Sequence, residues 1–292
     1  MACTLPSEIR ELANIPRTTV SSGCKIVTDP NNALFGFIPC DPDDMRARAA
    51  RATGRSITLD QYSLARNIAT EIGSGTIGEK VAMALSTMGR AALGTSGTTV
   101  TEVVLKNSKC SFGRGERCLY GSIHAAGNVD TAPFGRFTAS TQDPTLQDFA
   151  IAEFVLNGNA GNALALSNFA RGADDQWSPL ASKRGDRAAA VQTGLDKIGG
   201  EALQGDFWVG AICGVDPVKI QLFKRRAELK GTAEGTALIG QLRREYALNA
   251  RAPSVLGPNF TQAGGGGWLA LFAASAGYGT YRFIKYQRAK TR

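Results

Sequence analysis

A helix, a glycine turn and a second helix follow one another directly in Leu64–Ala91, LARNIATEIGSGTIGEKVAMALSTMGRA. Thr58 and Gln61 have the spacing of a capping box, so the first helix is predicted to begin just after Thr58. Its apolar residues recur at helical spacing and predict one stripe that faces a core: Leu64, Ile68 and Ile72. Two glycines, Gly73 and Gly75, then end the helix.

The second helix has equally clear ends. Thr76 and Glu79 form another capping-box pattern, and apolar residues repeat the helical period as far as Gly94. These apolar residues are Val81, Leu85, Met88 and Ala92. Glu79 therefore has a structural explanation as a capping residue, whereas Glu71, in the first helix, has none.

Glu71 lies at the edge of the apolar stripe, seven residues after Leu64 and three after Ile68. A carboxylate at the rim of an apolar surface has its charged form desolvated, so we expect its pKa to be raised. A raised pKa keeps part of the acid protonated near neutrality, as a glycosidase needs for protonating the departing glycosidic oxygen. The alternative is a surface glutamate drawn close to the stripe, and periodicity does not separate the two.

The segment LARNIATE, followed by Val81-Ala82-x-Ala84 and then Arg90, resembles the cell-wall hydrolase family typified by spore-cortex-lytic enzymes. That family has a Leu-Ala-Arg-x-Ile-x-x-Glu helix, a short Gly-containing turn, a Val-Ala-x-Ala helix and a closing Asn-Arg. The resemblance implies a small lysozyme-like fold and cleavage of the peptidoglycan glycan strand, with Glu71 as the catalytic acid. One position departs from the pattern, because Gly89 stands where the family has Asn, and a polar group near the site is therefore missing.

A second block resembles the later half of such domains. It begins with a Gly-Arg-aromatic segment, Gly135–Ser140, and continues with a helix that Thr145 caps and Gly158 ends. The resemblance implies that this half helps to line the substrate groove, and in all it covers about Leu59 to Trp177. The substrate-binding residues that it implies are Arg90, Arg136, Phe137, Asn168 and Phe169.

Retaining and inverting hydrolases need two carboxylates, on opposite sides of the scissile bond. The carboxylates considered as a second catalytic group near Glu71 are Glu79, Glu102, Asp130 and Asp143. None stands at a spacing that demands a second catalytic role, since Glu79 is a cap and Asp143, before a proline, is typical of a turn. A single acid favours a lytic transglycosylase, in which the C6 hydroxyl of the sugar replaces water, and hydrolysis stays open as the alternative.

Composition limits the partners and cofactors. The 292 residues have a net charge of +8 and a pI near 9.3, which suits an anionic polymer such as peptidoglycan. No nucleic-acid fold signature accompanies the basic residues, so we expect no specific nucleic-acid partner. The single histidine, His124, is not part of a zinc-site pattern, and we expect no metal and no other cofactor.

Six cysteines are too few for a disulfide-built scaffold in a chain of this length. Cys110 and Cys118 bracket a Gly-containing turn, and Cys24 and Cys40 bracket a strand-like stretch. Each pair could form a clip in an oxidising compartment, and reduced thiols are the equal alternative. The N-terminus lacks the basic start and apolar run of a signal peptide, so we expect export by another route, such as a holin, lysis or a virion.

Four parts are predicted along the chain: an N-terminal arm (1–57), a lysozyme-like cell-wall hydrolase domain (58–187), a helical extension (188–251) and a tail (252–292). The extension is predicted to include helices over Val218–Lys230 and Ala237–Asn249. The tail combines a glycine hinge, Gly264–Gly267, with the apolar segment Trp268–Tyr281 and a basic end. Residues 263–284 are predicted to contact a membrane or, equally, to pack on a neighbouring subunit.

These observations predict a mainly α protein (α+β with little strand). The resemblance implies that its catalytic domain is lysozyme-like, with additional N- and C-terminal helices. The predicted activity is peptidoglycan glycan-strand cleavage, by lytic transglycosylation or muramidase-type hydrolysis, with Glu71 as general acid and base. A lytic domain with this architecture suits a phage or phage-like particle that opens the wall locally, so we expect a virion or host-envelope location and other particle subunits as partners. The alternative is a catalytically inactive structural protein of a virion or secretion-type assembly, built on the same fold.

Overall fold

A computed structural model of the protein describes most of the chain between residues 4 and 251, with a gap over 106–141. The described positions are 4–25, 27, 29, 31, 38, 40–94, 97–105, 142–158, 160–164, 166, 168–198, 206–225 and 227–251. The chain divides into two compact units, Met1–Val255 and Leu256–Arg292, and all described residues belong to the first. The predicted hinge at Gly264–Gly267 and the predicted contact segment 263–284 therefore lie outside the described residues.

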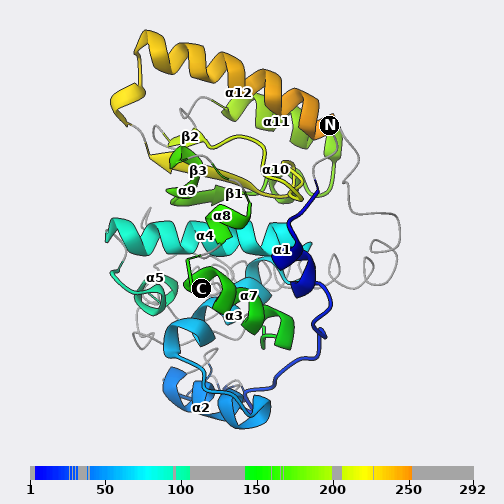
Figure 1. Ribbon diagram of the computed structural model, residues 1–292, viewed down its shortest axis with the longest axis vertical. Helices are drawn as coiled ribbons and strands as arrows, with labels where there is room; N and C mark the ends of the chain where they lie inside the picture. Colours follow the sequence, from blue (N-terminus) through cyan, green and yellow to red (C-terminus); the bar gives the residue numbers. More distant parts are fainter. Residues whose placement is uncertain are drawn as a thin grey trace, which may run out of the picture. The chain divides into compact units, whose positions relative to one another are not determined.

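The described part of the chain is mainly helical, as predicted, with a short antiparallel sheet in its C-terminal part (Figure 1). The longer helices are α1 (Ser7–Leu12), α2 (Pro42–Thr53), α3 (Leu59–Ile72), α4 (Ile77–Leu93), α5 (Val100–Leu105), α7 (Leu146–Leu156), α11 (Arg187–Lys197) and α12 (Ala233–Arg251). The short ones are α8 (Ala160–Ala163), α9 (Asn168–Arg171), α10 (Pro179–Ser182) and the 3-10 turn η2 (Ala227–Leu229). The strands are β1 (Asp175–Trp177), β2 (Asp206–Trp208) and β3 (Gln221–Arg225).

Local signals set the helix ends. α7 begins with the predicted cap, since Thr145 and Asp148 form a reciprocal capping box, and α4 ends at Gly94, which has a left-handed φ of 69°. α2 has Asp41 as its N-cap and Pro42 at its first position, where the missing N–H costs nothing. The predicted cap of α7 and the predicted end of α4 are confirmed.

α4 packs against α3, α5 and α7 and also against β1 and β3 (Figure 1). Leu222 belongs to the larger core that α3, α4 and α7 share, whereas its neighbour Phe223 belongs to a smaller core with Trp208 and Tyr246. Successive side chains of a strand point to opposite faces, so β3 contributes to both cores. The sheet therefore has α4 on one face and the pair α11–α12 on the other.

The strand order in the described sheet is β1-β3-β2, and both pairings are antiparallel. The predicted helix over Val218–Lys230 is wrong, because this segment contains the central strand β3 followed by η2. Apolar residues alternate through Val218, Ile220 and Leu222, which is the period of a strand rather than of a helix. The predicted helix over Ala237–Asn249 is confirmed as part of α12.

The larger core takes residues from three of the predicted parts, including Met45 of the arm, Leu64 of the hydrolase domain and Leu222 of the extension. These parts are therefore packed together within the first unit. A disulfide joins Cys24 to Cys40, and Cys213 is also disulfide-bonded. Cys110 and Cys118 lie outside the described residues.

Candidate functional site

Helix α3 is buried along most of its length and reaches the surface at Glu71. Every residue from Tyr62 to Ala69 is buried, whereas Thr70, Glu71 and Ile72 are partly exposed. The last turn of α3 therefore places a carboxylate where a buried helix meets solvent. This is the setting that the sequence predicts for the acid.

The start of α3 forms only one half of the predicted capping box. The Thr58 hydroxyl accepts a hydrogen bond from the backbone N–H of Gln61 at 3.1 Å, as predicted. The Gln61 side chain does not return this bond but donates to the Phe149 carbonyl oxygen at 3.4 Å. Gln61 therefore links α3 to α7.

The turn after Glu71 requires its glycines. A Cβ atom on Gly73 would lie 2.4 Å from the Ala69 carbonyl oxygen, and one on Gly75 would lie 2.6 Å from Cγ1 of Ile72. Both distances are too short for any other residue. The two glycines therefore allow α4 to begin immediately after the end of α3.

Glu79 has the capping role predicted for it. The Thr76 backbone N–H donates to Oε2 of Glu79 at 2.9 Å, and the Glu79 N–H donates to the Thr76 hydroxyl at 3.2 Å. The other carboxylate oxygen, Oε1, lies 3.5 Å from Nζ of Lys219. Burial raises the pKa of Glu79, and the charge of Lys219 opposes this shift. Glu79 is thus a structural carboxylate beside the turn.

The loop that contains Gly214 packs against the beginning of α4. The Thr76 hydroxyl donates to the Gly214 carbonyl oxygen at 3.1 Å, and a Cβ atom on Gly78 would lie 2.6 Å from the same oxygen. A Cβ atom on Gly214 itself, which has a φ of +73°, would lie 2.8 Å from Cδ2 of Leu5. Residues of the predicted extension thus support the turn that follows Glu71.

A different face of α3 binds the segment before α7. Nη1 of the buried Arg66 lies 2.7 Å from Oδ1 of Asp143 and donates to the Tyr62 hydroxyl at 3.1 Å. The Gln142 N–H donates to the Thr70 hydroxyl at 3.0 Å. At 100° per residue, Glu71 lies about 140° around the helix axis from Arg66, so Asp143 is held on another face of α3 than Glu71.

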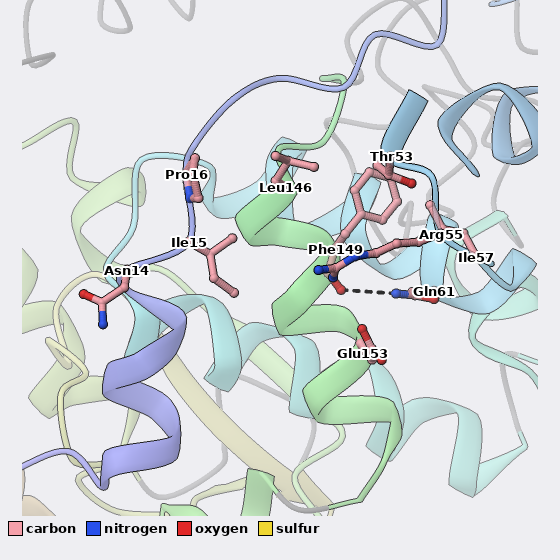
Figure 2. A pocket seen from close by; sticks show the side chains of 10 residues that line it. All are labelled: Asn14, Ile15, Pro16, Thr53, Arg55, Ile57, Gln61, Leu146, Phe149 and Glu153. Carbon is pink, nitrogen blue, oxygen red and sulfur yellow. Dashed lines mark hydrogen bonds between the residues drawn. The ribbon is translucent and has the colours of Figure 1, made fainter. Parts of the chain in front are cut away.

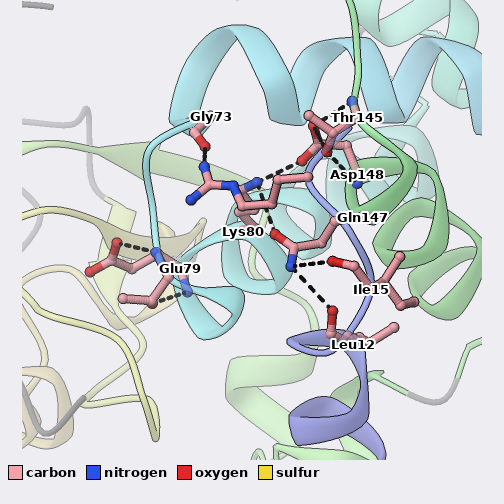
Figure 3. A network of polar contacts seen from close by, with 10 residues as sticks. Leu12, Ile15, Gly73, Glu79, Lys80, Thr145, Gln147 and Asp148 are labelled. Carbon is pink, nitrogen blue, oxygen red and sulfur yellow. Dashed lines mark hydrogen bonds and ion pairs between the residues drawn. The ribbon is translucent and has the colours of Figure 1, made fainter. Parts of the chain in front are cut away.

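A polar network connects the N-terminal arm to the same turn (Figure 3). Arg17 donates a hydrogen bond to the Gly73 carbonyl oxygen, directly after α3. Nε2 of Gln147 donates to the carbonyl oxygens of Leu12, at 3.2 Å, and Ile15, at 3.3 Å. The arm is therefore attached both to the turn and to the start of α7.

Lys80 lies at the centre of this network and is fully buried. Its Nζ is 2.7 Å from Oδ1 of Asp148 and 3.4 Å from Oε1 of Gln147. Burial lowers the pKa of Lys80, and the charge of Asp148 opposes this shift. Sequence analysis missed Lys80, because a charged residue on an amphipathic helix is usually solvated and no local pattern pairs it with a residue 68 positions later.

Three of the four carboxylates considered as a second catalytic group have structural partners. Glu79 caps α4, and Asp143 pairs with Arg66. Oε2 of Glu102 accepts hydrogen bonds from the N–H groups of Thr98, at 2.7 Å, and Thr99, at 3.2 Å, which lower the pKa of Glu102. The fourth, Asp130, lies outside the described residues.

Arg90 is buried near the end of α4 and interacts with β1. Its Nε donates to the Asp174 carbonyl oxygen at 2.8 Å, and its Nη2 forms an ion pair with Asp175. It lies 13 residues after Ile77, about 20 Å along the axis of α4, and so near the end of that helix remote from the turn. Its predicted contact with substrate stays a prediction, and its guanidinium has a structural role.

The side chains of the other predicted substrate-binding residues are not among those that the structure describes. Asn168 lies at the start of α9 together with Phe169, and the structure describes their backbone. Arg136 and Phe137 lie outside the described residues, and the roles predicted for these four residues stay predictions. His124, for which no role is predicted, also lies outside the described residues.

A second cluster of charged groups lies where the strands meet α4. The carboxylates of Asp174, Asp175 and Asp206 gather there with Arg90 and Arg225, whose Nε is 3.8 Å from Oδ1 of Asp206. Burial, together with the charges of Asp175 and Asp174, raises the pKa of Asp206 to about 7, and Arg225 opposes the shift. The sequence places these residues on short segments far apart and does not predict the cluster.

Within the described ranges, no group of three or more His, Cys, Asp or Glu residues is arranged to hold a metal ion. None of the described helices is long and apolar enough to cross a membrane. Comparison with protein-family models, with curated proteins and with solved structures gives no match.

Proposed function

We propose that the protein cleaves the glycan strand of peptidoglycan on a lysozyme-like domain, with Glu71 as general acid and then general base. The observation that carries this proposal is the burial profile of α3. Eight buried residues in succession, Tyr62–Ala69, end at a partly exposed glutamate beside a glycine turn. The turn that follows Glu71 is held in place by the Glu79 cap and by hydrogen bonds to Gly214 and from Arg17.

The chemistry that fits one acid is lytic transglycosylation. Glu71 donates its proton to the glycosidic oxygen, the bond from C1 to that oxygen breaks, and the C6 hydroxyl of the same sugar then bonds to C1. The hydroxyl proton passes to Glu71, which restores the acid. The structural partners of Glu79, Glu102 and Asp143 support this reaction over one that needs a second carboxylate.

A phage or phage-like particle that opens the wall locally is the setting we propose for this activity. The net charge of +8 supports binding to the anionic wall polymer. The C-terminal residues 263–284, which contain an apolar segment, would attach the protein to a membrane or to other subunits.

Purified sacculi test the proposal directly. The full-length protein is incubated with sacculi, turbidity is followed, and the soluble products are identified by mass. Products with a 1,6-anhydro end support transglycosylation, and products with a reducing end indicate hydrolysis. Sacculi that stay intact and yield no product would overturn the proposed activity in favour of the inactive structural protein.

A further inference from the structure

A pocket of about 380 Å³ lies between the N-terminal arm, the connection from α2 to α3, and α7 (Figure 2). Gln61, in the first turn of α3, is one of its lining residues. Glu71 lies ten residues further along the same helix, about 15 Å away along its axis. The pocket is therefore separate from the proposed catalytic acid. Its volume lies within the range of small-molecule sites, roughly 300–1,000 Å³.

The walls of this pocket combine apolar and charged side chains. Ile15 lies on one side with its arm neighbours, and Leu146 and Phe149 of α7 supply further apolar surface (Figure 2). Arg55, from the α2–α3 connection, and Glu153, from α7, lie across the pocket from the arm. A ligand in this pocket would thus contact an apolar surface and two opposite charges.

Both charged groups are available to a ligand. Among the residues that the structure describes, the side chains of Arg55 and Glu153 are exposed and take part in no hydrogen bond or ion pair. They contrast with Arg66, Lys80 and Arg90, each of which has a carboxylate partner. Because Arg55 and Glu153 lie on one pocket and do not neutralise each other, the pocket offers a cation and an anion together.

We propose that this pocket binds the peptide stem of peptidoglycan. A guanidinium pairs well with a carboxylate, and a carboxylate pairs with an ammonium group, so Arg55 and Glu153 together select a short peptide that carries both charges. Alanine methyl groups of the stem would lie on Ile15, Leu146 and Phe149. The identity of this peptide rests on the proposed function, whereas the zwitterionic character of the ligand follows from the pocket itself.

Binding of a soluble peptide by the full-length protein tests this site. The probe is a synthetic stem pentapeptide with free carboxylates and a free lysine amine, titrated by calorimetry. Arg55→Gln and Glu153→Gln are each expected to weaken binding about tenfold, since each removes one charge-assisted contact. Arg51→Gln and Glu8→Gln are matched controls, because both residues are exposed and neither lines the pocket, and they should leave the affinity unchanged.

Modified peptides assign each charge to its partner. Amidation of the peptide carboxylates should weaken binding to the unmodified protein, and Arg55→Gln should then cause no further loss. Acetylation of the lysine amine should likewise weaken binding to the unmodified protein, and Glu153→Gln should then cause no further loss. Absence of saturable binding, or equal affinities for the pocket variants and the controls, would overturn the inference. Cleavage of sacculi without peptide binding would reject the pocket alone, and peptide binding without cleavage would reject the proposed function alone.

Discussion

Gly89 of α4 lies directly against the backbone of Ala173: a Cβ atom on Gly89 would be 1.8 Å from the Ala173 carbonyl oxygen. No side chain fits at this position, so the glycine has a packing reason. It stands where the cell-wall hydrolase pattern has Asn. The next residue, Arg90, binds the Asp174 carbonyl oxygen, and α4 and this segment are therefore held in close contact.

Gly89→Ala should destabilise the protein by about 1–3 kcal/mol, because the added methyl group forces α4 away from Ala173. Gly240→Ala, in α12, is the matched control. Its Cβ would meet nothing closer than Nη1 of Arg244 at 3.7 Å, so the better helix propensity of Ala should stabilise α12 by up to about 1 kcal/mol. Urea unfolding of both variants measures these opposite signs, and equal effects would contradict the close contact at Gly89.

The buried pair of Lys80 and Asp148 should respond asymmetrically to substitution. Asp148→Ala leaves the Lys80 ammonium group buried with Gln147 at 3.4 Å as its remaining described hydrogen-bond partner, and should cost about 3–5 kcal/mol. Lys80→Met should cost about half as much. In that variant Asp148 still accepts hydrogen bonds from the backbone N–H and hydroxyl of Thr145, at 2.9 and 2.7 Å, which stabilise its charge.

Denaturant unfolding of the two single variants at pH 7 measures this difference. Asp43→Ala is a suitable control for Asp148→Ala, since Asp43 pairs with Arg46 in a largely exposed position and should contribute less than about 1 kcal/mol. A larger loss for Lys80→Met than for Asp148→Ala would contradict the assignment of Thr145 as the remaining partner.

Features that depend on residues close together in the sequence could be predicted, whereas features that depend on packing between remote segments could not. The capping box of Thr76 and Glu79 and the end of α4 at Gly94 were predictable, because each depends on residues within one turn. The strand β3 was missed although Val218, Ile220 and Leu222 alternate, and its pairing with β1, more than 40 residues earlier, has no local pattern.

In the candidate site, too, the local features were predictable and the long-range contacts were not. The location of Glu71 at the end of a buried helix was predictable from the apolar stripe and the glycines. The supports of the turn were not, since Arg17 and Gly214 come from segments that are remote in the sequence. Arg66 is part of the motif, yet its pairing with Asp143 depends on how the segment before α7 packs.

Asp206 should make the stability of the protein fall as the pH rises. Its pKa is raised to about 7 in the folded state, against about 3.9 in an unfolded chain, so the folded state holds a proton that the unfolded state has released between these values. The stabilisation is complete below pH 4 and is lost as the pH rises through 7. The side chain of the Asp206→Asn variant cannot titrate, so the free energy of unfolding of this variant should fall less as the pH rises. At pH 8 the variant should be more stable than the unmodified protein.

Unfolding free energies measured from pH 4 to pH 8 check this expectation. Asp196→Asn is the control, because Asp196 is exposed on α11, and its pH profile should follow that of the unmodified protein. Asp174 and Glu79, whose pKa values burial also raises, keep part of the slope in both variants. A profile of Asp206→Asn parallel to the unmodified one would contradict the raised pKa.

Glu71→Gln should abolish cleavage of sacculi while leaving the fold and sacculus binding intact. A general acid contributes on the order of 10²–10⁴ in rate, and Gln has the same shape without the proton. Glu79→Gln is the matched control on the same helix–turn–helix, because its amide oxygen can still accept the Thr76 N–H. The ion pair with Lys219 at 3.5 Å is lost, but burial already disfavours the charged form of Glu79, so a neutral side chain should be tolerated there. The Glu79→Gln variant should therefore retain turnover, and the Glu71→Gln variant should not. The release of soluble products is measured under conditions in which both variants are folded. Equal losses of activity in the two variants would show that the turn, rather than the acid at Glu71, is what the reaction requires.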